Sequence, residues 1–413
     1  MSTDIEHIDE IREQFAKLQS RDDLLELLNF AKKLMYGEES SPIRLKALTY
    51  YSNPDIAKNR YREFSISKKS GGKRKIHAPV KGLKTIQKCL NLVLQSVFEP
   101  HIAATGFVPG RSIVDNAMIH KGMHYVYNID LKDFFPSIGF KRIKTCLGLP
   151  PFNLDDKIQD GRGLLAFYIT HLCCASMEVE RRDNTNTWTK QTRFVLPQGA
   201  PTSPIITNIV SQRLDRKLTG LAKRFGAKYS RYADDITFSS SHNIYQKGSE
   251  FIVELNRIIE EQHFDINPLK TRLQKSCYRQ EVTGLIVNEK PNVRRRYVKN
   301  IRTMLNNWEK LGFDEANRIF LSEYTNDKGH INKVVPGFAN VLSGKLEFLK
   351  MVKGTGDSTY ISMSQRFHDL IKREKLSRIQ QIDFNEIVEV LLKDGIDKAM
   401  VLFDKYKTED YGS

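Results

Sequence analysis

The strongest constraint on the fold is a strand–turn–strand pattern around two adjacent aspartates. Residues 227–240 (AKYSRYADDITFSS) place apolar and aromatic side chains on both sides of Asp234 and Asp235, which predicts a β-hairpin with the acids at its turn. Two neighbouring carboxylates repel each other, and a fold keeps them together where a cation or a function requires them. Two further Asp-Asp pairs, at 22–23 and 155–156, fall in a helical pattern and in a polar loop, where we interpret them as solvated surface acids.

A third aspartate ends another predicted strand. Residues 124–130 (HYVYNID) alternate in the same way, and Asp130 is the last of them. If this strand pairs with the 227–240 hairpin, Asp130 lies beside the acidic turn. Carboxylate oxygens suit Mg²⁺, and two such ions roughly 3.5–4 Å apart activate an attacking hydroxyl and stabilise a leaving oxygen. The spacing alone leaves two interpretations open, a metal site and ordinary surface acids.

The chain is strongly basic, which favours a polyanionic partner. Lys and Arg number 65 against 49 Asp and Glu, a net charge of +16. Charge alone is equally consistent with a basic protein that has no particular partner. The 5 cysteines form no CxxC pair, the N-terminus resembles no signal peptide, and no apolar stretch of about 18 residues occurs. We therefore expect a cytoplasmic protein with no membrane partner.

The periodicity of apolar residues predicts an α+β fold. Helical spacing over 5–34, 81–98, 204–225 and 250–262 alternates with strand patterns, and the chain after Arg294 is mostly helical. At 413 residues the chain is too long for one ordinary core. The expected parts are an N-terminal helical extension (1–48), a central α+β core (49–288), a helical region (289–372) and a C-terminal helical extension (373–413).

Turn signals and apolar spacing add two hairpins and a helical tail. Gly71-Gly72 marks the turn of a hairpin over 60–80, and DNTN marks the turn of another over 176–195. Within 373–413, apolar residues around 384–392 and 400–403 predict two further helices.

Seven motifs in order resemble those of reverse transcriptases. They are GGKRKIHAP (71–79), GFVPGRSIVDNA (106–117), Asp130 with LKDFFPSI, LPQGAPTSP (196–204), YADD (232–235), NPLKT (267–271) and VTGLIVN (282–288). The resemblance extends over roughly residues 50–370. It implies a right-hand polymerase with fingers, a ferredoxin-like palm and a helical thumb. It also implies an RNA-directed DNA polymerase that uses dNTPs and two Mg²⁺ ions.

Within that family the chain is most similar to bacterial retron reverse transcriptases. The similarity rests on NAMIH (116–120), VTG (282–284) and SGKLEFLKMVKGTGDSTY (343–360). It implies that a structured non-coding RNA is copied into cDNA from a 2′-hydroxyl primer, giving a branched RNA–DNA product, with an effector or toxin protein as partner in phage defence. The alternatives are another defence-associated or group II intron-like reverse transcriptase, and a scaffold that binds RNA and an effector with polymerisation secondary.

The resemblance also assigns the residues of the chemical centre. Asp130, Asp234 and Asp235 are the catalytic acids and metal ligands, and Leu131 belongs to the same metal site. Phe135 matches the ring that excludes a 2′-hydroxyl, although a core aromatic is the alternative.

Further positions are implied around the nucleotide and the primer. The nucleotide-binding residues are Lys73, Arg74, Gln198, Gly199 and Lys270, the last a candidate proton donor. The primer- and template-binding residues are Tyr232, Ala233, Arg294, Arg295, Arg296 and Lys299. A solvated basic surface remains the alternative for the exposed cations. We expect His120 to position RNA or the fold rather than to catalyse.

Overall fold

The structure is a computed structural model that describes residues 5–67, 72–155, 162–182, 187–328, 336–380 and 400. It divides into two compact units, residues 1–290 and 291–413, and each is described by itself. In the described part of the chain, no helix is both long and apolar enough to cross a membrane.

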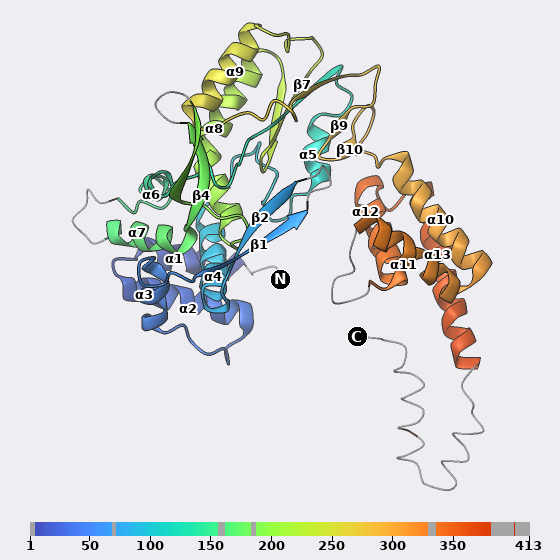
Figure 1. Ribbon diagram of the computed structural model, residues 1–413, viewed down its shortest axis with the longest axis horizontal. Helices are drawn as coiled ribbons and strands as arrows, with labels where there is room; N and C mark the ends of the chain where they lie inside the picture. The colour runs from blue at the N-terminus through green and yellow to red at the C-terminus, as the bar shows by residue number, and fades with distance from the viewer. Residues whose placement is uncertain are drawn as a thin grey trace. The chain divides into compact units, whose positions relative to one another are not determined.

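The first unit contains a four-stranded antiparallel sheet (Figure 1). Its strands, in the order β6-β7-β3-β8, are β6 (Lys228–Tyr232), β7 (Asp235–Ser240), β3 (Tyr125–Asp130) and β8 (Arg272–Lys275). Helix α8 (Ser203–Arg224) lies between β3 and β6 in the chain, and α9 (Glu250–Glu261) lies between β7 and β8. This β-α-β-β-α-β order is ferredoxin-like, which confirms the predicted α+β class and palm.

The two palm helices share a buried core with the sheet, and α9 is amphipathic. Phe251, Leu255 and Ile258 recur at helical spacing on α9 and are buried. Helix α8 packs against α9 and β6. Ile129 and Ile236, which are cross-strand partners on β3 and β7, belong to the same apolar cluster.

The N-terminal helices share this core. They are α1 (Ile5–Ala16), α2 (Arg21–Tyr36) and α3 (Leu45–Ser52), and α1 and α2 pack against α4 (Lys81–Val97). Helix α2 begins with a capping box, in which Ser20 accepts from the Asp23 backbone and the Asp23 carboxylate accepts from the Ser20 backbone. Asp23 is therefore a helix-capping residue, whereas Asp22 is exposed, as expected of a surface acid.

Two long hairpins and several short elements complete the first unit. The hairpins are β1 (Tyr61–Ser67) with β2 (Lys73–Pro79), and β4 (Ala175–Arg182) with β5 (Trp188–Val195). Both match the predicted hairpins, and their turn residues 68–71 and 183–186 lie outside the described residues. The short elements are α5 (Ile113–Ile119), α6 (Phe140–Leu147), α7 (Arg162–Cys173), β9 (Glu281–Val282) and β10 (Leu285–Ile286).

The second unit is helical where it is described. Its helices are α10 (Arg295–Leu311), α11 (Phe313–Lys328), α12 (Phe338–Lys353) and α13 (Ser358–Gln380). Trp308 of α10 contacts the rings of Phe313, Phe338 and Phe367, so aromatic packing joins α10 to each of the other three helices. The two helices predicted beyond residue 380 lie outside the described residues, apart from Met400.

Candidate active site

The strand register brings the three predicted aspartates together. Asp130, the last residue of β3, is the cross-strand partner of Asp235, the first residue of β7. Asp234 occupies the β6–β7 turn, and its carbonyl accepts a hydrogen bond from the Leu131 backbone N–H at 3.1 Å. Residues about 100 positions apart in sequence therefore meet at one sheet edge, because β3 pairs directly with β7.

Crowding of these acids disfavours their charged forms. Partial desolvation, then the nearby Asp234 and Asp130, raise the pKa of Asp235 to about 6. Desolvation and Asp130 also raise the pKa of Asp234, while Lys270 and Arg74 oppose the rise. The Asp235 residue is nevertheless exposed to solvent, so its carboxylate lies near two other acids at the protein surface. A cation bound there would relieve the repulsion.

Asp130 already has hydrogen-bond partners in the loop between α9 and β8. Lys270 Nζ donates to Asp130 Oδ1 at 2.8 Å, and Asn267 Nδ2 donates to Asp130 Oδ2 at 3.1 Å. Partial burial opposes the charge of Lys270, but the hydrogen bond to Asp130 and the surrounding acids raise its pKa overall. Among the described residues, no three His, Cys, Asp or Glu side chains are gathered closely enough to hold a metal as they stand. The donor types fit a hard divalent cation, which would compete with Lys270 for Asp130.

The β1–β2 hairpin, which the resemblance places in the fingers, reaches the same site from another part of the chain. Arg74, on the exposed half of β2, lies close enough to Asp234 to lower its pKa. Lys73 is its neighbour on the same exposed strand end. The His77 backbone N–H of β2 donates to Gln198 O at 2.8 Å. Gly199 has φ +120°, and a Cβ there would lie 2.8 Å from Ile76 Cγ2, so only glycine lets the LPQG turn approach β2.

The turn that carries the acids is tightly packed. Ala233 has φ +57°, a left-handed conformation that is uncommon for a residue with a side chain. A Cβ at Gly106 would lie 2.5 Å from the Ala233 backbone nitrogen, so the Gly106 backbone presses directly on the turn. Tyr232 is half-buried beside it, and Phe135, also half-buried, follows Asp130 on the next loop.

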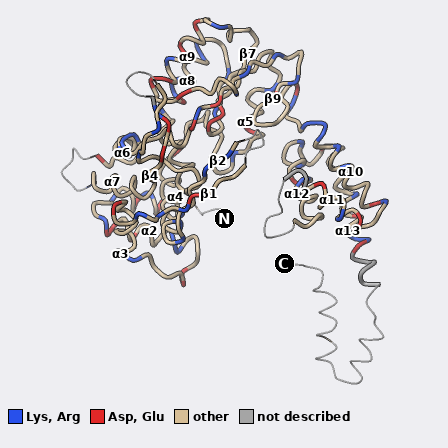
Figure 2. The backbone as a smooth tube through the Cα atoms, in the orientation of Figure 1, with Lys and Arg blue, Asp and Glu red and all other residues tan. Residues whose placement is uncertain are grey.

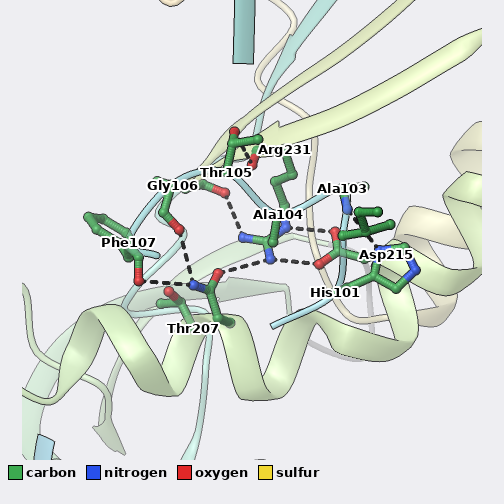
Figure 3. A network of polar contacts seen from close by, with 12 residues as sticks. His101, Ala103, Ala104, Thr105, Gly106, Phe107, Thr207, Asp215 and Arg231 are labelled. Atoms are coloured by element: carbon green, nitrogen blue, oxygen red, sulfur yellow. Dashed lines mark hydrogen bonds and ion pairs between the residues drawn. The ribbon is translucent and has the colours of Figure 1, made fainter. Parts of the chain in front are cut away.

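A fully buried ion pair lies beneath this turn (Figure 3). Arg231 Nε and Nη2 donate to the two carboxylate oxygens of Asp215 at 2.8 and 2.7 Å, which is the bidentate geometry of a strong pair. Arg231 Nη2 also donates to Asn208 Oδ1 at 3.0 Å, and Nη1 donates to the Ala233 carbonyl at 3.2 Å. Tyr229 Oη donates to Asp215 at 2.7 Å. Helix α8 thus holds the acidic turn through a satisfied polar network.

The NAMIH motif forms a second buried support. The His120 ring lies between two hydroxyls, with Nδ1 2.7 Å from Ser239 Oγ and Nε2 2.7 Å from Ser230 Oγ. Burial lowers its pKa to about 3, so the ring is neutral. Thr105 Oγ1 donates to Asn116 Oδ1 at 2.8 Å. His120 therefore joins α5 to β6 and β7, which supports the expected role in positioning the fold.

The predicted basic residues of the second unit lie at the start of α10. Arg295, Arg296 and Lys299 are exposed, and Arg294 is the residue that precedes the helix. Figure 2 colours Lys and Arg positions blue along the backbone, and blue segments mark the start of α10. Arg295, Lys299 and Arg302 share the spacing of one face of α10.

Several residues of the site escaped sequence reasoning. Asn267 falls inside a motif that is recognisable in the sequence, but nothing marks it as the partner of Asp130. Asn208 and Asp215 are seven residues apart on α8 and have buried apolar neighbours. Polar residues at such positions of a helix are the sequence signal that would have indicated buried polar partners. Arg231 sits in a buried strand, where a charged residue predicts a buried partner.

The comparisons with known proteins agree with this geometry. The family described as "Reverse transcriptase (RNA-dependent DNA polymerase)" matches residues 66–293. This range contains the three aspartates, the LPQG turn and the network beneath the acidic turn.

Individual relatives are retron reverse transcriptases. The chain is 36% identical over 293 residues to the retron Mx65 reverse transcriptase of Myxococcus xanthus, covering 68% of this chain and 64% of that protein. It is 36% identical over 305 residues to the retron Mx162 enzyme of the same organism, covering 68% and 59%. It is 31% identical over 253 residues to the retron Ec86 reverse transcriptase of Escherichia coli, covering 60% and 69%. The chain thus spans slightly less than two thirds of the length of the two Myxococcus relatives. It belongs to the reverse transcriptase family, in its retron-type group.

Proposed function

We propose that this protein is an RNA-directed DNA polymerase that extends a primer on an RNA template with dNTPs. The observation that carries the proposal is the pairing of Asp130 with Asp235 beside Asp234. Nucleotidyl transfer by two metal ions requires carboxylates on one small surface next to the triphosphate. Here the acids converge, and a basic strand end approaches them.

The roles of the residues follow from their places. Asp130, Asp234 and Asp235 supply the ligand oxygens, with Leu131 in the same site. Two Mg²⁺ ions, when bound, activate the primer hydroxyl and stabilise the charge on the leaving pyrophosphate. Lys270 holds a proton on Nζ beside these acids, which suits a proton donor to the leaving group.

The remaining residues recognise nucleotide and nucleic acid. Lys73 and Arg74 bind the triphosphate, and the planar guanidinium of Arg74 suits bidentate phosphate contact. Gln198 and Gly199 line the nucleotide, and Phe135 lies under the sugar and excludes a 2′-hydroxyl. Tyr232 and Ala233 contact the primer end. On the second unit, Arg294, Arg295, Arg296 and Lys299 bind backbone phosphates of the RNA–DNA product.

The retron relatives support a more specific template and partner. We infer that the template is a structured non-coding RNA, that synthesis starts from a 2′-hydroxyl of that RNA, and that the branched RNA–DNA product works with an effector protein in antiphage defence. Sequencing the nucleic acid that co-purifies with the protein tests this inference. A short branched RNA–DNA hybrid is the expected result, and cellular RNA without attached DNA would contradict it.

Primer extension on an RNA template tests the active site. Asp234→Asn and Asp235→Asn keep the shape of the turn but remove a ligand charge, so we expect synthesis to fall about 1,000-fold or more, since several kcal/mol of charge stabilisation are lost. EDTA should abolish synthesis and added Mg²⁺ should restore it.

A matched control uses the other acid pair in a described helix. Asp22→Asn changes an exposed aspartate at the start of α2 and should leave synthesis unchanged. Full synthesis by either of the Asp234 or Asp235 variants, with thermal unfolding like that of the wild type, would show that the assignment is wrong.

A further inference from the structure

We propose that Phe107 is a positioning residue for sugar selection, because its ring fixes the Phe135 ring in place. The inference rests on the proposed function, in which Phe135 excludes the 2′-hydroxyl. Phe107 belongs to the GFVPGRS motif, a segment to which the proposed mechanism gives no role. The inference rests on the ring contacts of Phe135, the backbone conformation of Phe107 and the close approach of Gly106 to the acidic turn.

The Phe135 ring contacts two other aromatic rings. Phe134 contacts it edge-on with ring centroids 5.8 Å apart, and Phe107 contacts it at 6.1 Å with an interplanar angle of 51°. Phe134 is buried and packs on Phe264, so that side is part of the core. Phe107 is half-buried and comes from a separate loop. We infer that its contact restricts rotation of the Phe135 ring from a different segment than Phe134 does.

The backbone of Phe107 is held in an uncommon conformation. Its φ is +60°, which for a bulky residue occurs where the surrounding structure imposes it. Asn208 Nδ2 donates to the carbonyls of Gly106 at 3.0 Å and Phe107 at 3.5 Å. The Thr105 N–H donates to the Arg231 carbonyl at 2.8 Å. Figure 3 shows Gly106 and Phe107 of this loop beside Arg231, which is paired with Asp215. Asn208 belongs to the same network, because its Oδ1 accepts from Arg231 Nη2.

One loop therefore contacts both halves of the proposed site. Gly106 presses on the backbone of the acidic turn, and Phe107 presses on the sugar-gating ring. Both residues are anchored to the same buried network, because Asn208 of α8 donates to their carbonyls. This arrangement fixes the distance between the acids and the gate, which is what discrimination between two sugars that differ by one hydroxyl requires.

The decisive measurement is the ratio of kcat/KM for a dNTP to that for the matching rNTP. Removing the Phe107 ring frees Phe135 to rotate and makes room for the hydroxyl. We expect Phe107→Ala to lower this ratio about 10-fold, the scale of steric discrimination in an apolar pocket, and Phe107→Leu to lower it less. Phe135→Ala should lower the ratio more than either. Tyr278→Ala, which truncates an exposed aromatic elsewhere in the first unit, should leave the ratio unchanged.

The double variant separates positioning from general loss of structure. If Phe107 acts through Phe135, then Phe107→Ala adds no further loss to Phe135→Ala, and the two effects are strongly non-additive. A purely structural role would lower dNTP and rNTP use equally and leave the ratio unchanged, which would overturn the inference. If Phe107→Ala does not fold, Phe107→Leu decides by the same ratio.

The failure of the proposed gate gives a different pattern. An unchanged ratio in Phe135→Ala would overturn the gate itself, and this inference with it. A lowered ratio in Phe135→Ala with wild-type ratios in both Phe107 variants would overturn this inference alone.

Discussion

Asp234 and Asp235 sit on a turn whose supports are buried, whereas Arg295 and Lys299 of α10 extend from an exposed helix face. Beneath the turn, a bidentate Arg231–Asp215 pair and a neutral His120 are completely enclosed. Helix α10 packs its apolar face inside the second unit and exposes its basic face to solvent. The two regions carry opposite charge and are supported in different ways.

The difference reflects what each region has to do. Carboxylates that share cations must be placed to within about 1 Å, because small displacements of reacting groups cost orders of magnitude in rate. Phosphate contacts tolerate long, mobile side chains, since backbone binding is electrostatic and largely independent of sequence. A buried polar network destabilises the fold when some of its groups lack partners, but when every group is paired it fixes the positions of the residues that it holds.

Breaking the buried pair should have the largest effect. Asp215→Ala leaves the Arg231 guanidinium buried without its carboxylate, which typically costs about 3–5 kcal/mol. We expect urea-induced unfolding of this variant to begin at much lower denaturant, with loss of primer extension because the acidic turn loses its support. The urea midpoint and the extension rate are the measurements.

An exposed ion pair provides the contrast. Glu254→Ala on α9 removes a surface partner of Arg257 and should leave the urea midpoint nearly unchanged. Equal destabilisation by Asp215→Ala and Glu254→Ala would remove the distinction between the two kinds of region.

The proximity of Asp130 to Asp234 and Asp235 could be predicted from the sequence, because it depends on local strand patterns. Alternation fixed the strand containing Asp130 and the hairpin containing Asp234, and one pairing of these two elements was enough to join them. The helices followed from apolar spacing in the same way. The order of the motifs then supplied the palm topology.

The residues that support the acidic turn could not be paired from the sequence, because their contacts join side chains of different helices, strands and loops. The buried stripe of α8 indicates that Asp215 has a buried partner, but only the placement of β6 against α8 identifies that partner as Arg231. Phe107 similarly lies in a loop whose left-handed backbone no local sequence pattern predicts. Burial and direction of polar groups are tertiary properties, so a single sequence leaves them open.

Removing an exposed cation of the fingers should affect binding without affecting stability. Arg74→Ala deletes a charge-assisted phosphate contact, so we expect the KM for dNTP to rise roughly 10- to 100-fold. Arg74→Lys keeps the charge but not the fork and should recover part of the loss. Steady-state primer extension gives KM, and the urea midpoint should stay at the wild-type value. A changed midpoint with an unchanged KM would place Arg74 among the structural residues.

Lowering the pH should weaken the buried support at His120. Its folded pKa of about 3 lies below the ordinary value of 6.5, so between these values the unfolded chain binds a proton that the folded chain does not. The free energy of unfolding therefore falls as pH drops below about 6.5, by up to about 1.4 kcal/mol per pH unit for this group.

The variant His120→Asn isolates this contribution. It lacks the titrating ring, so its unfolding free energy should fall less steeply than that of the wild type between pH 6.5 and pH 5. His77, His101 and His171 also have lowered pKa values and contribute to both proteins equally. Between pH 7 and pH 8.5 the two slopes should coincide. Parallel curves below pH 6.5 would mean that His120 is not the buried neutral group described above.

The smallest effect is expected on the exposed face of α10. Lys299→Ala should weaken binding of an RNA–DNA hybrid only a few-fold and reduce the slope of log K against log[salt] by about 0.7–0.9, the value for one lost phosphate contact. Fluorescence anisotropy at several salt concentrations measures both quantities. Arg318→Ala, which removes a cation already paired with Glu315 on α11, is the matched control and should leave the slope unchanged. If both variants reduce the slope equally, α10 contributes only its share of the overall charge. If Lys299→Ala instead destabilises the protein as Asp215→Ala does, the contrast between a buried, position-setting region and an exposed, charge-bearing one fails.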